Sequence, residues 1–206
     1  MMVILSVSLS NEAILSTWST QDILSPLLLI NVQTSLRRLI SDINRLLSSA
    51  SGATLHRGSN DVGPRSCSLT KGLVAYSLPQ FGDRDTTTVC FAYTVHNHKR
   101  RIIAALIYMP VEEQLPPTML EQICMYCKQE NLPLIVAYDT NAHHPVWGGG
   151  DSNCRGKILS EFLAISVLEV AIIGNELTFS VSNVRSIIDV TLVSHTLLQD
   201  ISNWHV

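Results

Sequence analysis

Apolar and polar positions recur with two different periods along the chain, and together they predict an α/β (α+β) protein. Compact apolar runs at 27–32 and 132–138 are typical of buried strands. The segments 88–95 and 101–108 flank a polar turn, which predicts a β-hairpin with a basic tip. Two further short strands are predicted near the end of the chain, at 177–181 and 187–193.

Helical spacing of apolar residues predicts three helices. The first covers Leu36 to Leu47, the second 118–130, and the third 155–167. The apolar face of the second is expected at Leu120, Ile123 and Cys127, and that of the third at Ile158, Phe162 and Ile165. The Ser/Gly-rich stretch 48–68 is interpreted as a loop.

The chain of 206 residues is expected to divide into an N-terminal extension, 1–25, and one domain, 26–206. The extension has no clear period and makes a poor signal peptide. No apolar run approaches the ~20 residues of a membrane span, so we expect a soluble protein without a membrane partner.

Composition and net charge limit the classes of fold and partner. Apolar residues make up 46% of the chain, enough for a core, and the net charge is −3, so no global basic field indicates a nucleic-acid partner. Local basic spots at Arg37-Arg38, 99–101 and Arg155 with Lys157 are either solvated surface charge or DNA contacts.

Five cysteines without a regular framework favour a reducing, intracellular compartment. Cys124 and Cys127 form a lone C-x-x-C on one helix face. Core packing is favoured there over zinc binding, because a structural zinc site needs four ligands.

The densest group of chemically active residues follows the apolar run 132–138. Asp139, Asn141, His143 and His144 lie within six residues, which suits the rim of an active site. The alternative is an Asx-type turn with surface histidines.

Three single positions add to this group. Asp189 interrupts an apolar strand, where an Asp is costly unless it is hydrogen-bonded or bound to a cation. Asn31 ends the first buried strand, and Tyr108 ends the hairpin. A hydrogen-bonded core Asp and ordinary strand-end residues are the structural alternatives.

These residues fall into an ordered pattern. Asp139-x-Asn141-Ala-His is followed by Trp147-Gly148, Arg155-Gly156, Thr178-Phe179 and Ser186-x-Ile188-Asp189. The pattern resembles the endonuclease/exonuclease/phosphatase superfamily, and more narrowly the apurinic-endonuclease-like domain of arthropod non-LTR retrotransposons. The similarity extends over residues 27–206 and implies a deoxyribonuclease-I-like two-sheet β-sandwich flanked by helices.

The resemblance also implies roles for the residues of the pattern. Asp139 would activate the attacking water, Asn141 would hold the scissile phosphate, and Tyr108 would contact that phosphate. Asp189 would pair with a catalytic His, and Asn31 would lie beside a Mg²⁺ site. The implied substrate-binding candidates are His143, His144, Arg155 and Thr178.

The implied activity is metal-dependent nicking of target DNA by a monomeric domain fused to a reverse transcriptase, in the nucleus if it acts as a retroelement protein.

Two parts of the family pattern are missing. No Glu occurs between Glu12 and Glu112, so the metal-binding Glu and its strand are expected to be absent. The family's Ser-Asp-His motif is not found either. We therefore expect an incomplete fold and an impaired nuclease. The alternatives are an inactive nucleic-acid-binding remnant or a phosphatase of the same superfamily.

Overall fold

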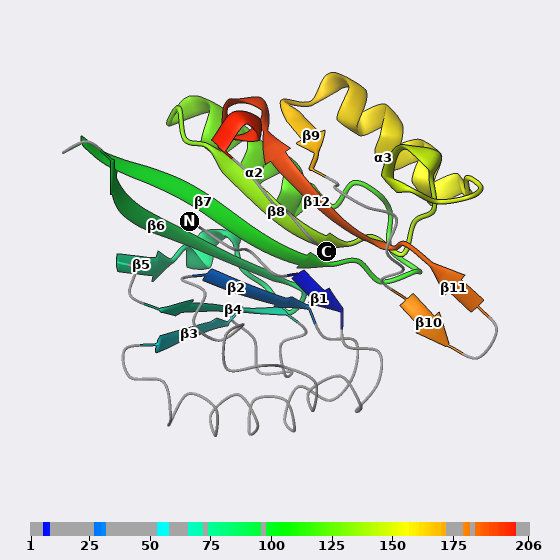
Figure 1. Ribbon diagram of the computed structural model, residues 1–206, viewed down its shortest axis with the longest axis horizontal. Helices are drawn as coiled ribbons and strands as arrows, with labels where there is room; N and C mark the ends of the chain where they lie inside the picture. The colour runs from blue at the N-terminus through cyan, green and yellow to red at the C-terminus, as the bar shows by residue number, and fades with distance from the viewer. Residues whose placement is uncertain are drawn as a thin grey trace.

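The computed structural model describes residues 6–8, 27–31, 53–57, 66–71, 74–95, 98–171, 179–181 and 184–200. These residues form two sheets, and helices cover the outer face of the larger one (Figure 1). A small hairpin extends from one end of the molecule (Figure 1). The architecture is a two-sheet α/β sandwich, as the sequence predicts.

The larger sheet has six strands in the order β5-β6-β7-β8-β12-β9. Only β7 and β8 run parallel; every other pair is antiparallel. The strands are β5 (Val74–Ser77), β6 (Thr86–Val95), β7 (His98–Tyr108), β8 (Leu134–Asp139), β9 (Leu168–Val170) and β12 (Asp189–Ser194). The predicted hairpin and both buried strands are thus confirmed for the residues described, with residues 98–100 part of β7 instead of the turn.

The smaller sheet has four strands in the order β1-β2-β4-β3. Strands β1 and β2 are parallel, and β4 is antiparallel to both of its neighbours. The strands are β1 (Ser6–Ser8), β2 (Leu27–Asn31), β3 (Ala53–Arg57) and β4 (Ser66–Lys71). The separate hairpin pairs β10 (Phe179–Val181) with β11 (Val184–Ser186).

Helices α2 (Thr118–Gln129) and α3 (Cys154–Ile165) pack on the six-stranded sheet (Figure 1). Short 3-10 turns lie at Pro79–Phe81, Pro145–Trp147 and His195–Asp200. In α2 the buried residues are Leu120, Ile123 and Cys127, which is the face predicted from the sequence.

The predicted inner face of α3 is wrong in part. Phe162 is partly buried and packs on the core, as predicted, whereas Ile165 is 87% exposed and Ile158 is also exposed. Gly156 and Leu159 are the buried residues of this helix. The close contact of Gly156 with the segment after β8 sets which side of the first turn faces inward.

Alternation along β7 separates the two faces of the large sheet. Ile103, Ala105 and Ile107 pack with the residues of α2 and α3, whereas Ala104 and Leu106 belong to the core on the opposite side. That opposite side meets the four-stranded sheet, because the hydroxyls of Ser66 on β4 and Thr87 on β6 lie 2.8 Å apart. Even-numbered residues near the end of β7 therefore face the space between the sheets.

The stretch 48–68, which we expected to be a loop, contains β3 and the start of β4. Its short segments alternate polar and apolar residues, as in Ala53-Thr54-Leu55-His56, and serine-rich composition concealed this period. Pairing with a neighbouring strand then overrides weak strand propensity. Strand β5 was also not predicted.

Three residues of the expected N-terminal extension, Ser6–Ser8, form strand β1 beside Leu29–Asn31. The boundary near residue 25 stays a prediction, since most of the segment 1–25 and the helix expected from Leu36 to Leu47 lie outside the described residues. Among the helices described, none is long and apolar enough to cross a membrane.

Candidate active site

Three of the predicted site residues lie side by side on neighbouring strands of the large sheet. Tyr108, the last residue of β7, is in register with Asp139, the last residue of β8. Asp139 in turn lies opposite Asp189, the first residue of β12. Residues in register project to the same face of a sheet, so the three side chains share one face at one end of three strands.

That face is the one between the two sheets. Tyr108 is two residues after Leu106, and Asp139 is two residues after Ala137, so each points to the same face of the sheet as that apolar residue. Leu106 and Ala137 belong to the core between the sheets. Asp139 is fully buried at 0% exposure, and Asp189 is buried at 1%. The fold thus places two carboxylates inside the sandwich at its edge.

The end of β2 lies at the same end of the sandwich. Asn31 is in register with Ser66, whose hydroxyl contacts Thr87 at the start of β6. Thr87 is in register with Leu106, two residues before Tyr108. The backbone of Asn31 therefore ends near the strand ends that carry Tyr108 and Asp139. Its expected place beside a Mg²⁺ site stays a prediction.

The turn after β8 is bonded to the strands on both sides. On one side, Asp139 O accepts from Met109 N at 2.9 Å and Met109 O accepts from Asn141 Nδ2 at 2.9 Å. On the other side, Ile188 O accepts from Thr140 N at 3.0 Å and from Thr140 Oγ1 at 2.8 Å. These bonds fix the positions of Asp139 and Asn141 relative to Tyr108 and Asp189.

Asn141 has the backbone conformation that its residue type tolerates best. Its φ of 46° lies in the left-handed region, where Asn is enriched among non-glycine residues. Asn141 N also donates to Asp139 Oδ1 at 3.4 Å, which is an Asx-type turn. The alternative interpretation of this segment as an Asx-type turn is thus confirmed at Asp139 and Asn141, and its interpretation as a site stays a prediction.

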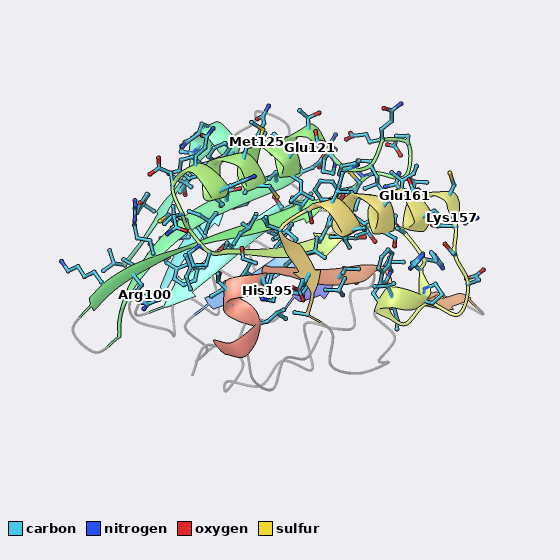
Figure 2. The ribbon with its side chains drawn as sticks, turned by 90° about the horizontal axis from the view of Figure 1, so that it is seen from above. Arg100, Glu121, Met125, Lys157, Glu161 and His195 are labelled. Atoms are coloured by element: carbon cyan, nitrogen blue, oxygen red, sulfur yellow. The ribbon has the colours of Figure 1, made fainter. Side chains whose placement is uncertain are left out.

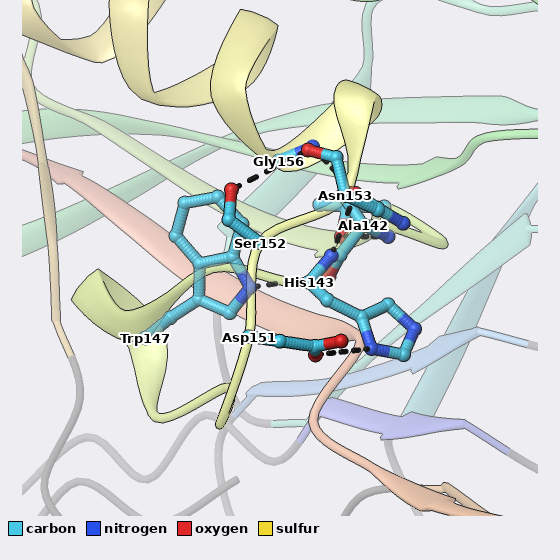
Figure 3. Close-up of polar contacts among 8 residues, drawn as sticks. Ala142, His143, Trp147, Asp151, Ser152, Asn153 and Gly156 are labelled. Atoms are coloured by element: carbon cyan, nitrogen blue, oxygen red, sulfur yellow. Dashed lines mark hydrogen bonds and ion pairs between the residues drawn. The ribbon is translucent and has the colours of Figure 1, made fainter.

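The segment between Asn141 and α3 is held by Asn153. The Asn153 Oδ1 atom accepts from His143 N at 3.2 Å and from Gly156 N at 2.7 Å, so one amide caps α3 and anchors the turn (Figure 3). The buried Trp147 donates its indole N–H to Ala142 O at 3.2 Å (Figure 3). Both residues support the backbone directly after the candidate site.

Gly156 permits the closest contact in this region. A Cβ at this position would lie 1.9 Å from His143 O, so any side chain would collide with the backbone. The Trp147-Gly148 and Arg155-Gly156 pairs of the sequence pattern thus receive a physical explanation: they fit the connection onto the first turn of α3.

The two histidines have local partners. His143 Nδ1 lies 4.0 Å from Asp151 Oδ1 and is partly exposed (Figure 3). His144 Nδ1 accepts from Val146 N at 3.2 Å, and its ring packs against Trp147 with centroids 5.1 Å apart. His144 therefore caps the 3-10 turn that follows it.

The Arg155 guanidinium donates to three backbone carbonyls. Its Nη1 reaches Val111 O at 3.0 Å and Glu113 O at 2.6 Å, and its Nη2 reaches Thr140 O at 3.1 Å. The side chain connects α3, the loop after β7 and the turn after β8. Its expected contact with substrate stays a prediction, as do the substrate contacts of His143 and His144, and Thr178 lies outside the described residues.

Sequence reasoning missed Asn153 as a bridging residue. The signal was present, because an Asn two residues before the start of the helix predicted at 155–167 is a capping pattern. Tyr138, the last residue of the predicted buried strand, is fully buried in β8, and burial raises the pKa of its hydroxyl. Tyr138 is in the core on the helix side and takes no part in the site.

The donor set for a metal is small in the described part of the chain. No group of three or more His, Cys, Asp or Glu side chains there could hold a metal ion. Asp139 and Asp189 are the two buried carboxylates of the site, and the described residues of β1 to β4 include no Asp or Glu. These residues alone do not make up a metal centre.

Solved structures share this fold. The endonuclease domain of TRAS1, a telomere-specific non-LTR retrotransposon, superposes with a TM-score of 0.76 at 18% identity, over 100% of this chain and 90% of that one. The catalytic domain of Xenopus laevis APE2 gives 0.67 at 11% identity, over 95% and 83%. A mannosyl-6-phosphatase of Bacteroides thetaiotaomicron gives 0.54 at 12% identity, over 95% and 86%.

These similarities confirm the deoxyribonuclease-I-like fold that the sequence pattern implied. No curated protein matches the chain at the level of sequence. A family profile does match, over residues 102–206, which include Tyr108, Asp139, Asn141 and Asp189. The chain belongs to the endonuclease–reverse transcriptase family, within the endonuclease/exonuclease/phosphatase superfamily.

Proposed function

We propose that this chain is a retrotransposon-type DNA endonuclease domain that hydrolyses phosphodiester bonds at a reduced rate. The observation that supports this proposal best is the alignment of Tyr108, Asp139 and Asp189 across three adjacent strands. The similarity to the TRAS1 endonuclease domain favours DNA as the substrate.

Phosphodiester hydrolysis needs a positioned water, a group that accepts its proton, and donors for the charge on the phosphoryl oxygens. Asp139 orients the water and accepts its proton, since its carboxylate lies at the centre of the three aligned residues. Tyr108, at the neighbouring strand end, donates its hydroxyl to a phosphate oxygen.

Asn141 holds the phosphate in place. Its side-chain NH₂ carries two N–H groups, of which one donates to Met109 O. The other can donate to a phosphate oxygen while the first fixes the direction of the amide. The role of Asp189 is the one that the family pattern implies, which is to pair with a catalytic His and hold its orientation.

Mg²⁺ would neutralise charge on the phosphate if it binds, and it usually uses one or two carboxylates and several waters. Asp139 and Asp189 are the described carboxylates at the site, and no step above is assigned to a metal ion. The absence of Glu between Glu12 and Glu112 removes the metal-binding carboxylate that the family pattern places after its first helix. This is the reason for proposing a reduced rate.

A plasmid-nicking assay tests the proposal. Purified chain is incubated with supercoiled plasmid and Mg²⁺, Mn²⁺ or EDTA, and nicked product is measured over time. We expect slow nicking that Asp139→Asn removes. Glu161→Gln is the matched control, because it makes the same carboxylate-to-amide change at an exposed position of α3.

Two other outcomes distinguish the alternatives. DNA binding without nicking, unchanged by Asp139→Asn, indicates a nucleic-acid-binding remnant. Hydrolysis of mannose 6-phosphate without nicking indicates a phosphatase, the activity named for one structural neighbour. Either outcome replaces the proposed function.

The family description pairs the endonuclease with a reverse transcriptase. We propose that the domain acts as a monomer and makes a DNA nick, and that the nick supplies the primer for such an enzyme. Sedimentation of the purified chain measures the monomeric state.

A further inference from the structure

A basic groove lies at the end of the large sheet opposite the candidate active site. Its volume is about 700 Å³, and it lies between the start of β7, the end of α2, the start of β8 and the end of β12. The charged and titratable residues that line it are Lys99, Arg100, Arg101, Lys128, Glu130 and His195. Leu134, the first residue of β8, also lines it.

The groove and the site are separate. Leu134 and Asp139 are the two ends of β8, and five strand residues at ~3.3 Å each give about 16 Å between them. A phosphate bound by Lys128 therefore cannot be the phosphate that is held beside Asp139.

The charge of the groove contrasts with that of the chain. Four cationic side chains line it against one carboxylate, Glu130, although the whole chain has a net charge of −3. His195 pairs with Glu169, so it is not counted. In the described part of the chain, no ion pair involves Lys99, Arg100 or Lys128. These three cations are open to an anionic ligand.

An exposed aromatic ring lies next to the cations. Tyr76 on edge strand β5 is 46% exposed. It is in register with Cys90, which is in register with Ile103, so Tyr76 lies on the same face of the sheet as Arg101, two residues before Ile103. On the same face, the rings of Phe81 and Tyr126 pack with their centroids 5.0 Å apart. Tyr126 lies two residues before Lys128 on α2. Cations beside exposed aromatic rings are the combination that binds single-stranded nucleic acid.

We propose that this groove is a second nucleic-acid site, which binds the phosphates of a single strand through Lys99, Arg100, Arg101 and Lys128 while a base stacks on Tyr76. An acidic peptide would be attracted by the cations but has no base that could stack on the exposed ring of Tyr76. The site goes beyond the proposed function, because it needs neither Asp139 nor cleavage.

The test is fluorescence anisotropy with a labelled oligo-dT of about 20 nucleotides, in EDTA so that no cleavage interferes. We expect Lys128→Glu to weaken binding about fivefold or more and to reduce the slope of log affinity against log salt. Lys157→Glu should change binding less than about twofold. The two lysines are matched as exposed helix residues, and Lys157 lies at the other end of the long axis from Arg100 (Figure 2).

A second pair of variants tests the ring. Tyr76→Ala should weaken oligo-dT binding about fivefold, since stacking contributes to affinity at each base. Val74→Ala, at a 75% exposed position of the same strand, should leave it unchanged.

Lysine acetylation of the wild-type chain locates the bound strand without any variant. Oligo-dT should protect Lys99 and Lys128 but not Lys157 from acetylation. Absence of protection, or equal effects of Lys128→Glu and Lys157→Glu, would overturn the proposal. Equal competition by poly-glutamate of the same charge would also overturn it, in favour of an acidic protein partner. None of these readouts depends on nicking, so they can fail or succeed independently of the proposed function.

Discussion

Asp139 and Asp189 lie directly opposite each other on the antiparallel strands β8 and β12, and both are almost fully buried, at 0% and 1% exposure. Directly paired residues have Cβ atoms about 5 Å apart. The fold therefore holds two carboxyl groups close together at the position where the proposed chemistry needs them.

Asp189→Asn should reduce plasmid nicking while the protein stays folded, because asparagine is close to aspartate in size but has no carboxylate. Thermal unfolding followed by circular dichroism should remain cooperative, with a midpoint within about 4 °C of the wild type. Glu161→Gln, at an exposed position of α3, should change neither quantity. Wild-type nicking by Asp189→Asn would show that this carboxylate takes no part in the chemistry.

Gly156→Ala should destabilise the protein although alanine is the better helix former by about 1 kcal/mol. The new Cβ would lie 1.9 Å from His143 O, and backbone cannot move aside cheaply. We expect a loss of about 2 kcal/mol or more in urea unfolding, as for overpacked positions. Gly150→Ala is the control, because nothing lies within 4 Å of its added Cβ. Equal stability of the two variants would contradict the close contact.

Arg155→Lys should loosen the turn that carries Asp139 and Asn141. Lysine keeps the charge but cannot present the planar fork that reaches Val111 O, Glu113 O and Thr140 O. The expected cost is about 1–3 kcal/mol of unfolding free energy, since hydrogen bonds from charged donors are among the stronger ones, together with slower nicking. Lys157→Arg, two residues along the same helix, should have no effect. Wild-type stability with weaker DNA binding would instead support the sequence-based role of Arg155 as a substrate contact.

The cysteines of α2 should be slow to react. Burial raises the pKa of Cys127 from its ordinary value of 9.0 to about 12, and that of Cys124 to about 11. The thiolate is the reactive form, so at pH 8 both should lag behind the exposed Cys154 in a thiol-titration assay. Cys154→Ser should remove the fast phase. A fast phase that survives this change and maps to Cys124 or Cys127 would indicate a reactive pair.

The same shifts predict how stability depends on pH. A thiol whose folded pKa is raised stays neutral in the fold, so its contribution is full below pH 9.0, the unfolded value, and is lost as pH rises toward about 11–12. Urea midpoints should thus fall above pH 9. In the double variant Cys124→Ala, Cys127→Ala, that part of the fall should be smaller.

Strand periodicity predicted the central part of the fold correctly. The runs that became β6, β7 and β8 alternate or are continuously apolar, and their order along the chain fits a mixed sheet. The period failed where strands are short and lie in a Ser/Gly-rich stretch, as do Ala53–Arg57 and the start of Ser66–Lys71, because such segments become strands only by pairing with each other. It failed in part on α3, where Gly156 is buried by contact with another segment and Ile158 and Ile165 are exposed.

The sequence predicted the individual residues of the candidate site, but it did not predict the strand register that brings them together. Nothing in the local sequence indicates that Asp189 pairs with Asp139 and not with a neighbour two residues away, because register depends on the whole strand. The role of Arg155 was equally hidden: an Arg that binds three carbonyls and an Arg that binds phosphate have the same sequence pattern.

The rate of plasmid nicking by the wild-type chain, relative to its Asp139→Asn variant, tests the proposed active site most directly. We predict that the wild type nicks supercoiled plasmid about 100-fold or more faster than Asp139→Asn. We also predict that it stays well below the rate of the TRAS1 endonuclease domain under the same conditions. Equal rates for the wild type and Asp139→Asn would contradict the assignment of the site.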